Sequence, residues 1–224
     1  MKTAIYGIVA ARRGSTRFPD KVLADILGKP MLQRVLERVQ MAGLLERVIL
    51  ATTPNEEDKV LLDLATRLGF DSFAGSEQDV LDRFYRCAEG ANTIVRITSD
   101  CPLIDPKLID GMLQYHFLCE NDITTSRPSY PDGMDIEVIS YPTLQRTWEE
   151  ATLPYDREHV TTYPLAYPER FKVGRFLYDV DLPEYHWSVD YPEDLEFIST
   201  VYEVMGEYFT FADLISAVGV GALG

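Results

Sequence analysis

The sequence has 224 residues, of which 46% are hydrophobic and 25% charged, and its formal net charge at pH 7 is −15. This composition excludes a disordered chain, the acidity argues against general nucleic-acid binding, and no apolar run reaches the ~18 residues that a membrane-spanning helix needs. The three cysteines lack disulfide-framework or metal-ligand spacing, which favours a reducing compartment, so we expect a cytoplasmic protein that binds neither nucleic acid nor membrane.

The first half of the chain alternates strand-like and helix-like segments. Residues 5–10 predict a buried strand, and apolar residues then follow helical spacing to residue 39. The unit repeats through residues 48–68 and again through residues 80–98, where the strand follows its helix. Asp105 and Pro106 are typical of the cap and first turn of a further helix. This rhythm predicts an α/β fold of three layers, with helices on both faces of a mostly parallel sheet.

Beyond about residue 122 the rhythm changes. Prolines and a glycine predict a turn at residues 128–133, and period-two alternation predicts a half-exposed strand at 134–139. Aromatics and prolines continue, so we expect an inserted β-rich lobe over about 126–186 within a single domain of residues 1–224. Residues 187–190 predict a return to strand, and residues 192–205 predict a final helix.

The loop after the first strand reverses the sign of the chain, because the stretch from Arg12 to Lys21 holds four basic residues and one acid. It lies at the carboxyl edge of the sheet, where open α/β folds bind ligands. Small residues there let a ligand approach the backbone, and arginine and lysine suit a triphosphate, although a solvated connection also fits. The loop has neither a Walker A nor a Gly-x-Gly-x-x-Gly pattern. The predicted nucleotide-binding residues of this loop are Ala10, Ala11, Arg12, Gly14, Ser15, Arg17 and Lys21.

The segment Ala10–Lys21 resembles the signature of the CMP-sugar synthetases, the cytidylyltransferases that activate sugar acids such as 3-deoxy-manno-octulosonate. The match is strongest to their relatives called spore-coat polysaccharide biosynthesis protein F. It covers nearly the whole chain, which makes the resemblance specific where single pieces would be weak. The further matching segments are Gly28–Met31, Ala51–Thr53, Gly75–Arg83, Val95–Asp105, Asp132–Val138, Arg157–Thr161 and Val189–Leu195.

The resemblance implies a nucleotide-diphospho-sugar transferase-like fold and roles for particular residues. Arg12 and Lys21 would stabilise the transition state of nucleotidyl transfer, and Asp100 and Asp190 would hold Mg²⁺. From position alone, each aspartate fits a helix cap or a turn equally well. Ser76 and Arg83 match the region that approaches the nucleotide in the family, but Ser76 with Asp79 also fits a helix cap.

We expect the acceptor pocket in the inserted lobe, where Asp135 and Glu137 share one face of a strand and Arg157 and His159 form a compact motif. An exposed strand and a surface helix turn would explain the same residues. The predicted function is transfer of CMP from CTP to a sugar acid for surface polysaccharide synthesis. A sugar phosphate or another small acceptor such as a polyol or phosphonate, or a nucleotide-binding protein without turnover, stays open. The resemblance also implies a homodimer.

Two positions depart from the family pattern. Asp20 stands where relatives commonly have glycine, and it adds a negative charge beside the cationic loop. Ser99 stands where glycine commonly precedes the first metal-site aspartate, and a serine there would be strained if the position required a positive φ. Either departure would alter substrate choice or lower activity.

Overall fold

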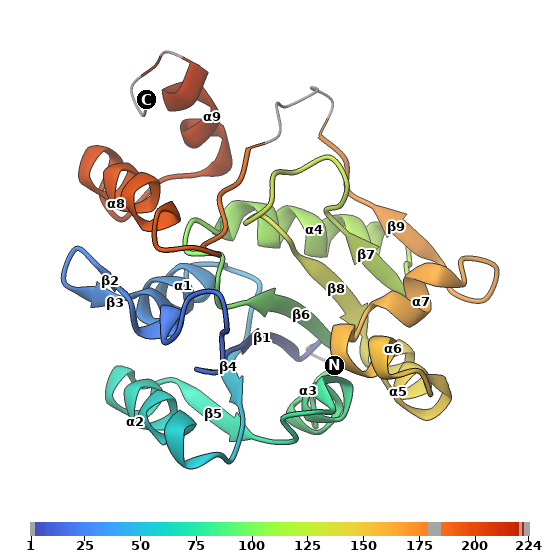
Figure 1. Cartoon of the computed structure of the whole chain (residues 1–224). Coiled ribbons are helices and arrows are strands. Elements are labelled where there is room, and N and C mark those ends of the chain that lie inside the picture. Colours follow the sequence, from blue (N-terminus) through green and yellow to red (C-terminus); the bar gives the residue numbers. More distant parts are fainter. Residues whose placement is uncertain (1–2, 179–184, 220, 222–224) are drawn as a thin grey trace.

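A seven-stranded sheet organises the chain in the computed structural model, which describes residues 3–178, 185–219 and 221 (Figure 1). The strand order is β5-β4-β1-β6-β8-β7-β9, and β5, β4, β1 and β6 run parallel. β8 is antiparallel to both of its neighbours, and β9 pairs in parallel with β7. The strands are β1 (Ile5–Ala10), β4 (Arg47–Thr52), β5 (Asp71–Ala74), β6 (Thr93–Thr98), β7 (Ile123–Thr125), β8 (Glu137–Ser140) and β9 (Val173–Arg175), with a separate ribbon of β2 (Asp25–Ile26) and β3 (Lys29–Pro30).

Helices cover both faces of this sheet, as predicted. Along β1, Ile5 and Val9 pack into a core with α1, α2, α4, α8 and α9, whereas Tyr6 and Ile8 pack into a second core with α3, α5 and α7. This period-two alternation buries β1 on both sides and gives the fold its three layers. The helices are α1 (Met31–Gln40), α2 (Lys59–Leu68), α3 (Val80–Cys87), α4 (Pro106–Leu118), α5 (Tyr141–Glu150), α6 (Pro154–His159), α7 (Thr162–Ala166), α8 (Asp194–Met205) and α9 (Phe211–Gly219), with 3₁₀ turns η1 (Lys21–Leu23) and η2 (Glu56–Asp58).

Local sequence signals set several of these boundaries. Asp105 caps α4, since its carboxylate accepts a 2.8 Å hydrogen bond from the Lys107 amide, and Pro106 occupies the first turn. Gly133 has φ 97°, and a Cβ atom there would lie 2.4 Å from the carbonyl carbon of Trp187. Glycine therefore allows the predicted turn to approach the segment before Asp190.

The prediction of an inserted β-rich lobe is wrong in its content. The described part of residues 126–186 contains three helices, α5 to α7, and its two strands, β8 and β9, join the central sheet. The predicted strand at 134–139 is confined to β8 and is buried rather than half-exposed, because α-helical and strand neighbours cover it. Residues 187–190 form no strand, and α8 is followed by a further helix, α9. Composition could not show that these strands complete a shared sheet.

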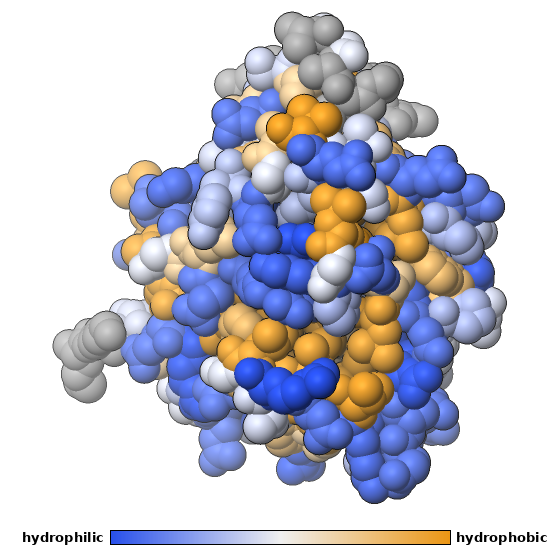
Figure 2. Space-filling view, turned by 90° about the vertical axis from the view of Figure 1, so that its left-hand side faces the viewer, coloured by the Kyte–Doolittle hydropathy of each residue, from blue (hydrophilic) through white to orange (hydrophobic). Residues whose placement is uncertain are grey.

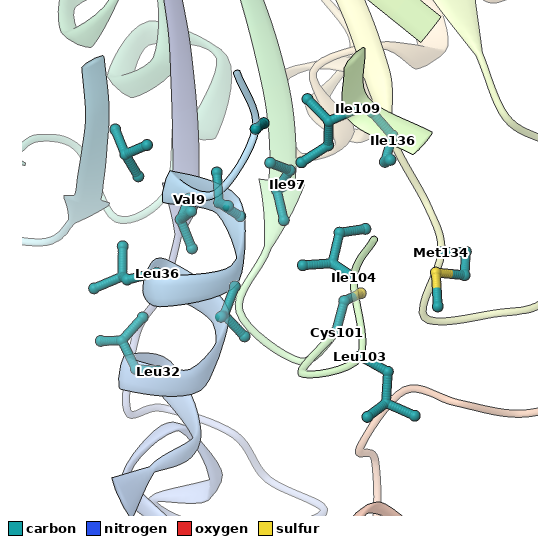
Figure 3. Close-up of a cluster of buried hydrophobic side chains, with 14 of the residues drawn as sticks. Val9, Leu32, Leu36, Ile97, Cys101, Leu103, Ile104, Ile109, Met134 and Ile136 are labelled. Carbon is teal, nitrogen blue, oxygen red and sulfur yellow. The ribbon is translucent and has the colours of Figure 1, made fainter. Parts of the chain in front are cut away.

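The loop after β6 is anchored by apolar side chains. Cys101, Leu103 and Ile104 are buried in the core, and Figure 3 shows Cys101 beside Ile104 in this loop, with Val9, Leu32 and Leu36 lying beyond it toward α1. Asp100 precedes Cys101 directly, so the anchored loop holds this carboxylate at the edge of the sheet.

The surface is mixed in character. The side shown in Figure 2 is hydrophilic over much of its area and carries separate hydrophobic patches. Within the described ranges, no helix is long and apolar enough to cross a membrane.

Candidate active site

The cationic loop leaves β1 and returns to the molecule at Lys21. The Ala11 amide donates a 3.1 Å hydrogen bond to the carbonyl of Ala51, which extends the pairing of β1 with β4. The Arg13 amide then donates to Asp58, at 2.8 Å, before the 3₁₀ turn η1 begins at Lys21. These attachments at both ends hold the loop over the carboxyl edge of the sheet.

Lys21 brings the two predicted metal-site aspartates together. Its Nζ donates to Asp100 Oδ2 at 3.0 Å and to the Val189 carbonyl at 2.8 Å, and it lies 3.6 Å from Asp190 Oδ1. Arg17 adds a 2.8 Å bond to the same Asp190 oxygen. The segment containing Asp190 is held against β6 because the Val189 amide donates to the Asp100 carbonyl at 2.9 Å. Residues 90 positions apart in the chain thus form one charged cluster.

The electrostatics of Asp100 reflect competition between burial and its cation. Burial acts to raise the pKa of this carboxyl group, but the Lys21 ammonium and hydrogen bonds from Thr98 and Lys21 outweigh it and lower the pKa. Asp100 is therefore ionised at neutral pH, as an oxygen ligand for a divalent cation must be.

A cavity of about 440 Å³, here called the loop pocket, opens beside the cationic loop. Five cationic side chains line it against two acidic ones, so its charge is opposite to that of the chain. All seven predicted nucleotide-binding residues of the loop contribute to the lining. The lining residues are Ala10, Ala11, Arg12, Gly14, Ser15, Thr16, Arg17, Lys21, Val22, Val80, Arg83, Arg96, Thr98, Ser99, Asp100, Glu158 and His159.

Two arginines of the loop pocket have unused donors. Arg83 is buried, which lowers its pKa, and it donates to the Ser76 carbonyl through Nη1 at 3.0 Å. Across the described ranges, three buried side-chain atoms lack a hydrogen-bond partner, and two of them are Nε of Arg83 and Nε of Arg96. Because an unpaired buried donor is costly, such atoms mark places where a ligand is expected to complete the bonding.

A second cavity of about 430 Å³, here called the β8 pocket, adjoins the first. The two share the lining residues Arg17, Arg96, Thr98, Asp100 and His159, so they form one cleft. The remaining lining residues of the β8 pocket are Cys101, Arg127, Asp132, Asp135, Glu137, Thr161, Ser188 and Asp190.

Charges in the β8 pocket are already paired. Arg127 contacts both carboxylate oxygens of Asp135 at 2.7 Å, and Arg96 donates to Glu137 at 2.7 Å. Asp135 and Glu137, the predicted acceptor-binding residues of this segment, both line the pocket. Burial raises the pKa of Asp135 despite the opposing effect of Arg127.

Two predicted site residues lie outside both pockets. Arg157, predicted to bind the acceptor, instead makes bonds to both carboxylate oxygens of Asp79 and a 2.7 Å bond to the Trp148 carbonyl. Ser76 follows the alternative interpretation, since its Oγ accepts from the Asp79 amide at 3.0 Å, next to the start of α3. Spacing along the chain indicated the Ser76–Asp79 contact, whereas the Arg157–Asp79 pair joins residues 78 positions apart that spacing does not reveal.

The two departures from the family pattern are harmless to the pocket geometry. Asp20 has φ 60°, which explains glycine in relatives, but its carboxylate points to Arg13 at 2.6 and 2.8 Å and lines neither pocket. Its negative charge is therefore compensated outside the cleft. Ser99 is not among the residues with a positive φ, so the condition under which a serine there would be strained is not met.

Sequence reasoning missed Arg96 and Arg127. Arg96 lies in β6, within a segment that matches the family, and a charged side chain in an apolar strand is itself a signal of a functional site. Arg127 is recognisable only through its contact with Asp135, eight residues away across a turn.

A profile of the cytidylyltransferase family matches residues 6–211 of the chain. The chain is 32% identical to the spore coat polysaccharide biosynthesis protein SpsF of Bacillus subtilis, over 91% of this chain and 88% of that protein. A 3-deoxy-manno-octulosonate cytidylyltransferase of Trichlorobacter lovleyi is 40% identical, over 49% of this chain and 44% of that protein.

A solved structure agrees with these matches. A cytidylyltransferase from Leptospira borgpetersenii superimposes with a TM-score of 0.91 at 29% identity, covering 99% of this chain and 95% of the other. The fold class predicted from the sequence is confirmed. The matched residues include the cationic loop, both aspartates and the segments that line the two pockets, and the chain belongs to the cytidylyltransferase family.

Proposed function

We propose that the protein transfers CMP from CTP to a hydroxyl group of a sugar acid, with release of pyrophosphate, in the synthesis of a surface polysaccharide. The observation that carries the proposal is the pair of adjoining pockets, one cationic and one rich in paired carboxylates, that meet at Asp100 and His159. A triphosphate suits the loop pocket, and a polyhydroxylated acceptor suits the β8 pocket.

The residues of the cleft divide the work of the reaction. Arg17 binds the phosphates, and Arg12 and Lys21 stabilise the charge that develops on the α-phosphate and on the departing pyrophosphate. The unused Nε–H group of Arg83 donates a hydrogen bond to the nucleotide. Asp135, Glu137 and His159 orient the acceptor so that its hydroxyl oxygen faces the α-phosphorus at the junction of the pockets.

Asp100 and Asp190 are the proposed holders of Mg²⁺. Both are carboxylates joined through one cation, Lys21, so their oxygens converge on the cleft and fit a hard divalent ion. No group of three or more histidine, cysteine or acidic side chains suited to a metal occurs in the part of the chain that the structure describes. Two carboxylates suffice for Mg²⁺, whose remaining ligands are usually water and phosphate oxygens. When bound, the ion would supply neutralising charge on the triphosphate.

Pyrophosphate release tests this proposal. CTP, UTP, ATP and GTP are each combined with a panel of sugar acids, with Mg²⁺ or with a chelator. CTP, one class of sugar acid and Mg²⁺ should together be required, and Asp100→Asn and Asp190→Asn should abolish turnover in a folded protein. Asp63→Asn, an exposed change on α2 outside both pockets, is the matched control. Full turnover in Asp100→Asn or with chelator would refute the assignment.

A second candidate acceptor is a polyol without a carboxylate. Each arginine that lines the β8 pocket contacts a carboxylate of the chain, and the pocket has five acidic residues against three cationic ones. That excess disfavours an anionic acceptor, a phosphate more than a singly charged carboxylate, and favours a neutral one. The same panel, extended to polyols, decides between the two.

We also propose that the protein is a cytoplasmic homodimer. The start of α6 and its preceding loop expose two large apolar side chains two positions apart in the chain, Leu153 and Tyr155, at 61% and 62%. Sedimentation velocity with Leu153→Ser and Tyr155→Ser should show a shift from dimer to monomer. A monomeric wild-type protein would contradict the proposal.

A further inference from the structure

A strained turn joins α6 to α7. Val160 has φ 61° and ψ −51° although it is fully buried, and the Thr161 amide donates to the His159 carbonyl at 2.6 Å. This combination of dihedral angles and an i to i+2 hydrogen bond is the classic γ-turn, which is rare and strained. For a β-branched residue a positive φ is a genuine outlier, so something must hold Val160 in place.

The turn directs two polar side chains into the same cleft. His159 lines both pockets and Thr161 lines the β8 pocket, while Val160 between them packs into the core beneath. In a continued helix, residues two apart project about 200° from one another, so His159 and Thr161 would point to opposite sides. The γ-turn removes that divergence.

Neighbouring helices brace the turn. Arg157, one turn of helix before Thr161, is bound to both carboxylate oxygens of Asp79 at the start of α3. The Val160 amide donates to the Asp156 carbonyl at 3.0 Å, and Thr162 Oγ1 donates to the Asp156 carboxylate at 2.7 Å. Strained backbone persists only where the surroundings determine it from several directions, and these bonds supply that determination.

We infer that Val160 and Arg157 are positioning residues for acceptor recognition: the γ-turn, braced through Asp79, presents His159 and Thr161 as hydrogen-bonding groups for the acceptor's hydroxyls at the junction of the two pockets. The inference rests on the proposed function. It replaces direct acceptor binding by Arg157 with an indirect role. It also explains the backbone strain at Val160, whose own side chain is buried in the core.

The first experiment compares Val160→Gly with Val160→Ala. Both remove the two γ methyl groups of Val160 and glycine also removes Cβ, but only glycine adopts a positive φ without strain, so the melting temperature of Val160→Gly should be no lower than that of Val160→Ala. Because glycine also frees the turn, the KM for the acceptor should rise roughly tenfold in Val160→Gly and less in Val160→Ala. The KM for CTP should stay within about twofold in both.

The second experiment changes the brace. Arg157→Lys keeps the charge but loses the paired geometry with Asp79, and it should raise the acceptor KM several-fold with little effect on the CTP KM. Arg86→Gln, which removes an exposed pair with Asp82 on α3, is the matched control. Should Val160→Gly fail to fold, Arg157→Lys still decides the matter.

The outcomes separate the inference from the proposed function. Absence of pyrophosphate release by the wild-type protein with every substrate pair would overturn the proposed function. An active wild-type protein with an unchanged acceptor KM in Val160→Gly and Arg157→Lys would overturn the positioning role alone. Equal rises in both KM values would also overturn it, because a merely structural lesion would not discriminate between substrates.

Discussion

The two sides of the cleft are built in different ways. The loop pocket draws most of its lining from one continuous segment, residues 10–22, and it has five cationic side chains against two acidic ones. The β8 pocket collects its lining from β6, the turn before β8, the end of α6 and the segment before α8, and its arginines are paired with carboxylates. A lining with an excess of cations suits a highly charged anionic ligand, whereas a lining of arginine–carboxylate pairs offers both donors and acceptors to hydroxyl groups.

The largest effect should come from Lys21→Ala, which removes the cation where the two sides meet. We expect kcat/KM to fall about 10³-fold, equivalent to about 4 kcal/mol, because transition-state charge loses its stabilising group. Pyrophosphate release measures this, and circular dichroism should show an intact fold. Lys59→Ala, exposed on α2, serves as the control. A loss below tenfold would mean that the loop binds without contributing to catalysis.

Acid should destabilise the contact between α4 and β7. His116 on α4 bonds Thr124 of β7 at 3.0 Å, and burial lowers its pKa to about 4. Since the unfolded histidine titrates near 6.5, stability from the neutral ring is complete above that pH and is lost as the pH falls toward 4, by about 3 kcal/mol at most. Urea unfolding from pH 7 to 4 measures this loss. His116→Gln should flatten the dependence of the unfolding free energy on pH, and the exposed change His186→Gln should not. The same pH dependence in the wild type and both variants would contradict the role given to His116.

Arg127→Gln should separate the two sides kinetically. Loss of the paired bonds leaves Asp135 without its cation, so the acceptor KM should rise about 10- to 100-fold, or roughly 2 kcal/mol. The CTP KM should change little, because Arg127 does not line the loop pocket. Steady-state kinetics with each substrate varied in turn provide the measurement. Arg146→Gln, which removes an exposed pair on α5, is the control, and a parallel rise in the CTP KM would show that the pockets are not functionally distinct.

Asp20→Gly should have the smallest effect. Glycine relieves the positive φ but loses an exposed ion pair and loosens the unfolded chain, so we expect a melting-temperature shift of about 2 °C or less and activity within about twofold. Ser99→Gly, at a position without a positive φ, should instead destabilise the fold. A tenfold change in the CTP KM of Asp20→Gly would indicate that this charge does reach the nucleotide.

The loop pocket and the layered α/β core could be predicted from the amino-acid sequence alone. Short-range signals suffice there: hydrophobic periodicity specified the parallel strands and their helices, and one contiguous cationic segment after β1 lies at the sheet edge wherever β1 is placed. The family resemblance then identified Asp100 and Asp190, which lie far apart in the chain and are brought together by their contacts with Lys21.

The lining and charge pairing of the β8 pocket could be established only from the folded structure. Whether Arg157 faced the acceptor or Asp79 depended on the position of α3, and whether β8 formed a lobe or joined the sheet depended on its pairing with β6. The partner that a side chain contacts depends on distances in the folded structure, and periodicity along the chain does not encode those distances. The strained Val160 shows this most clearly, since nothing in a valine predicts a positive φ and only the packing of α3, α5 and α7 around it imposes one.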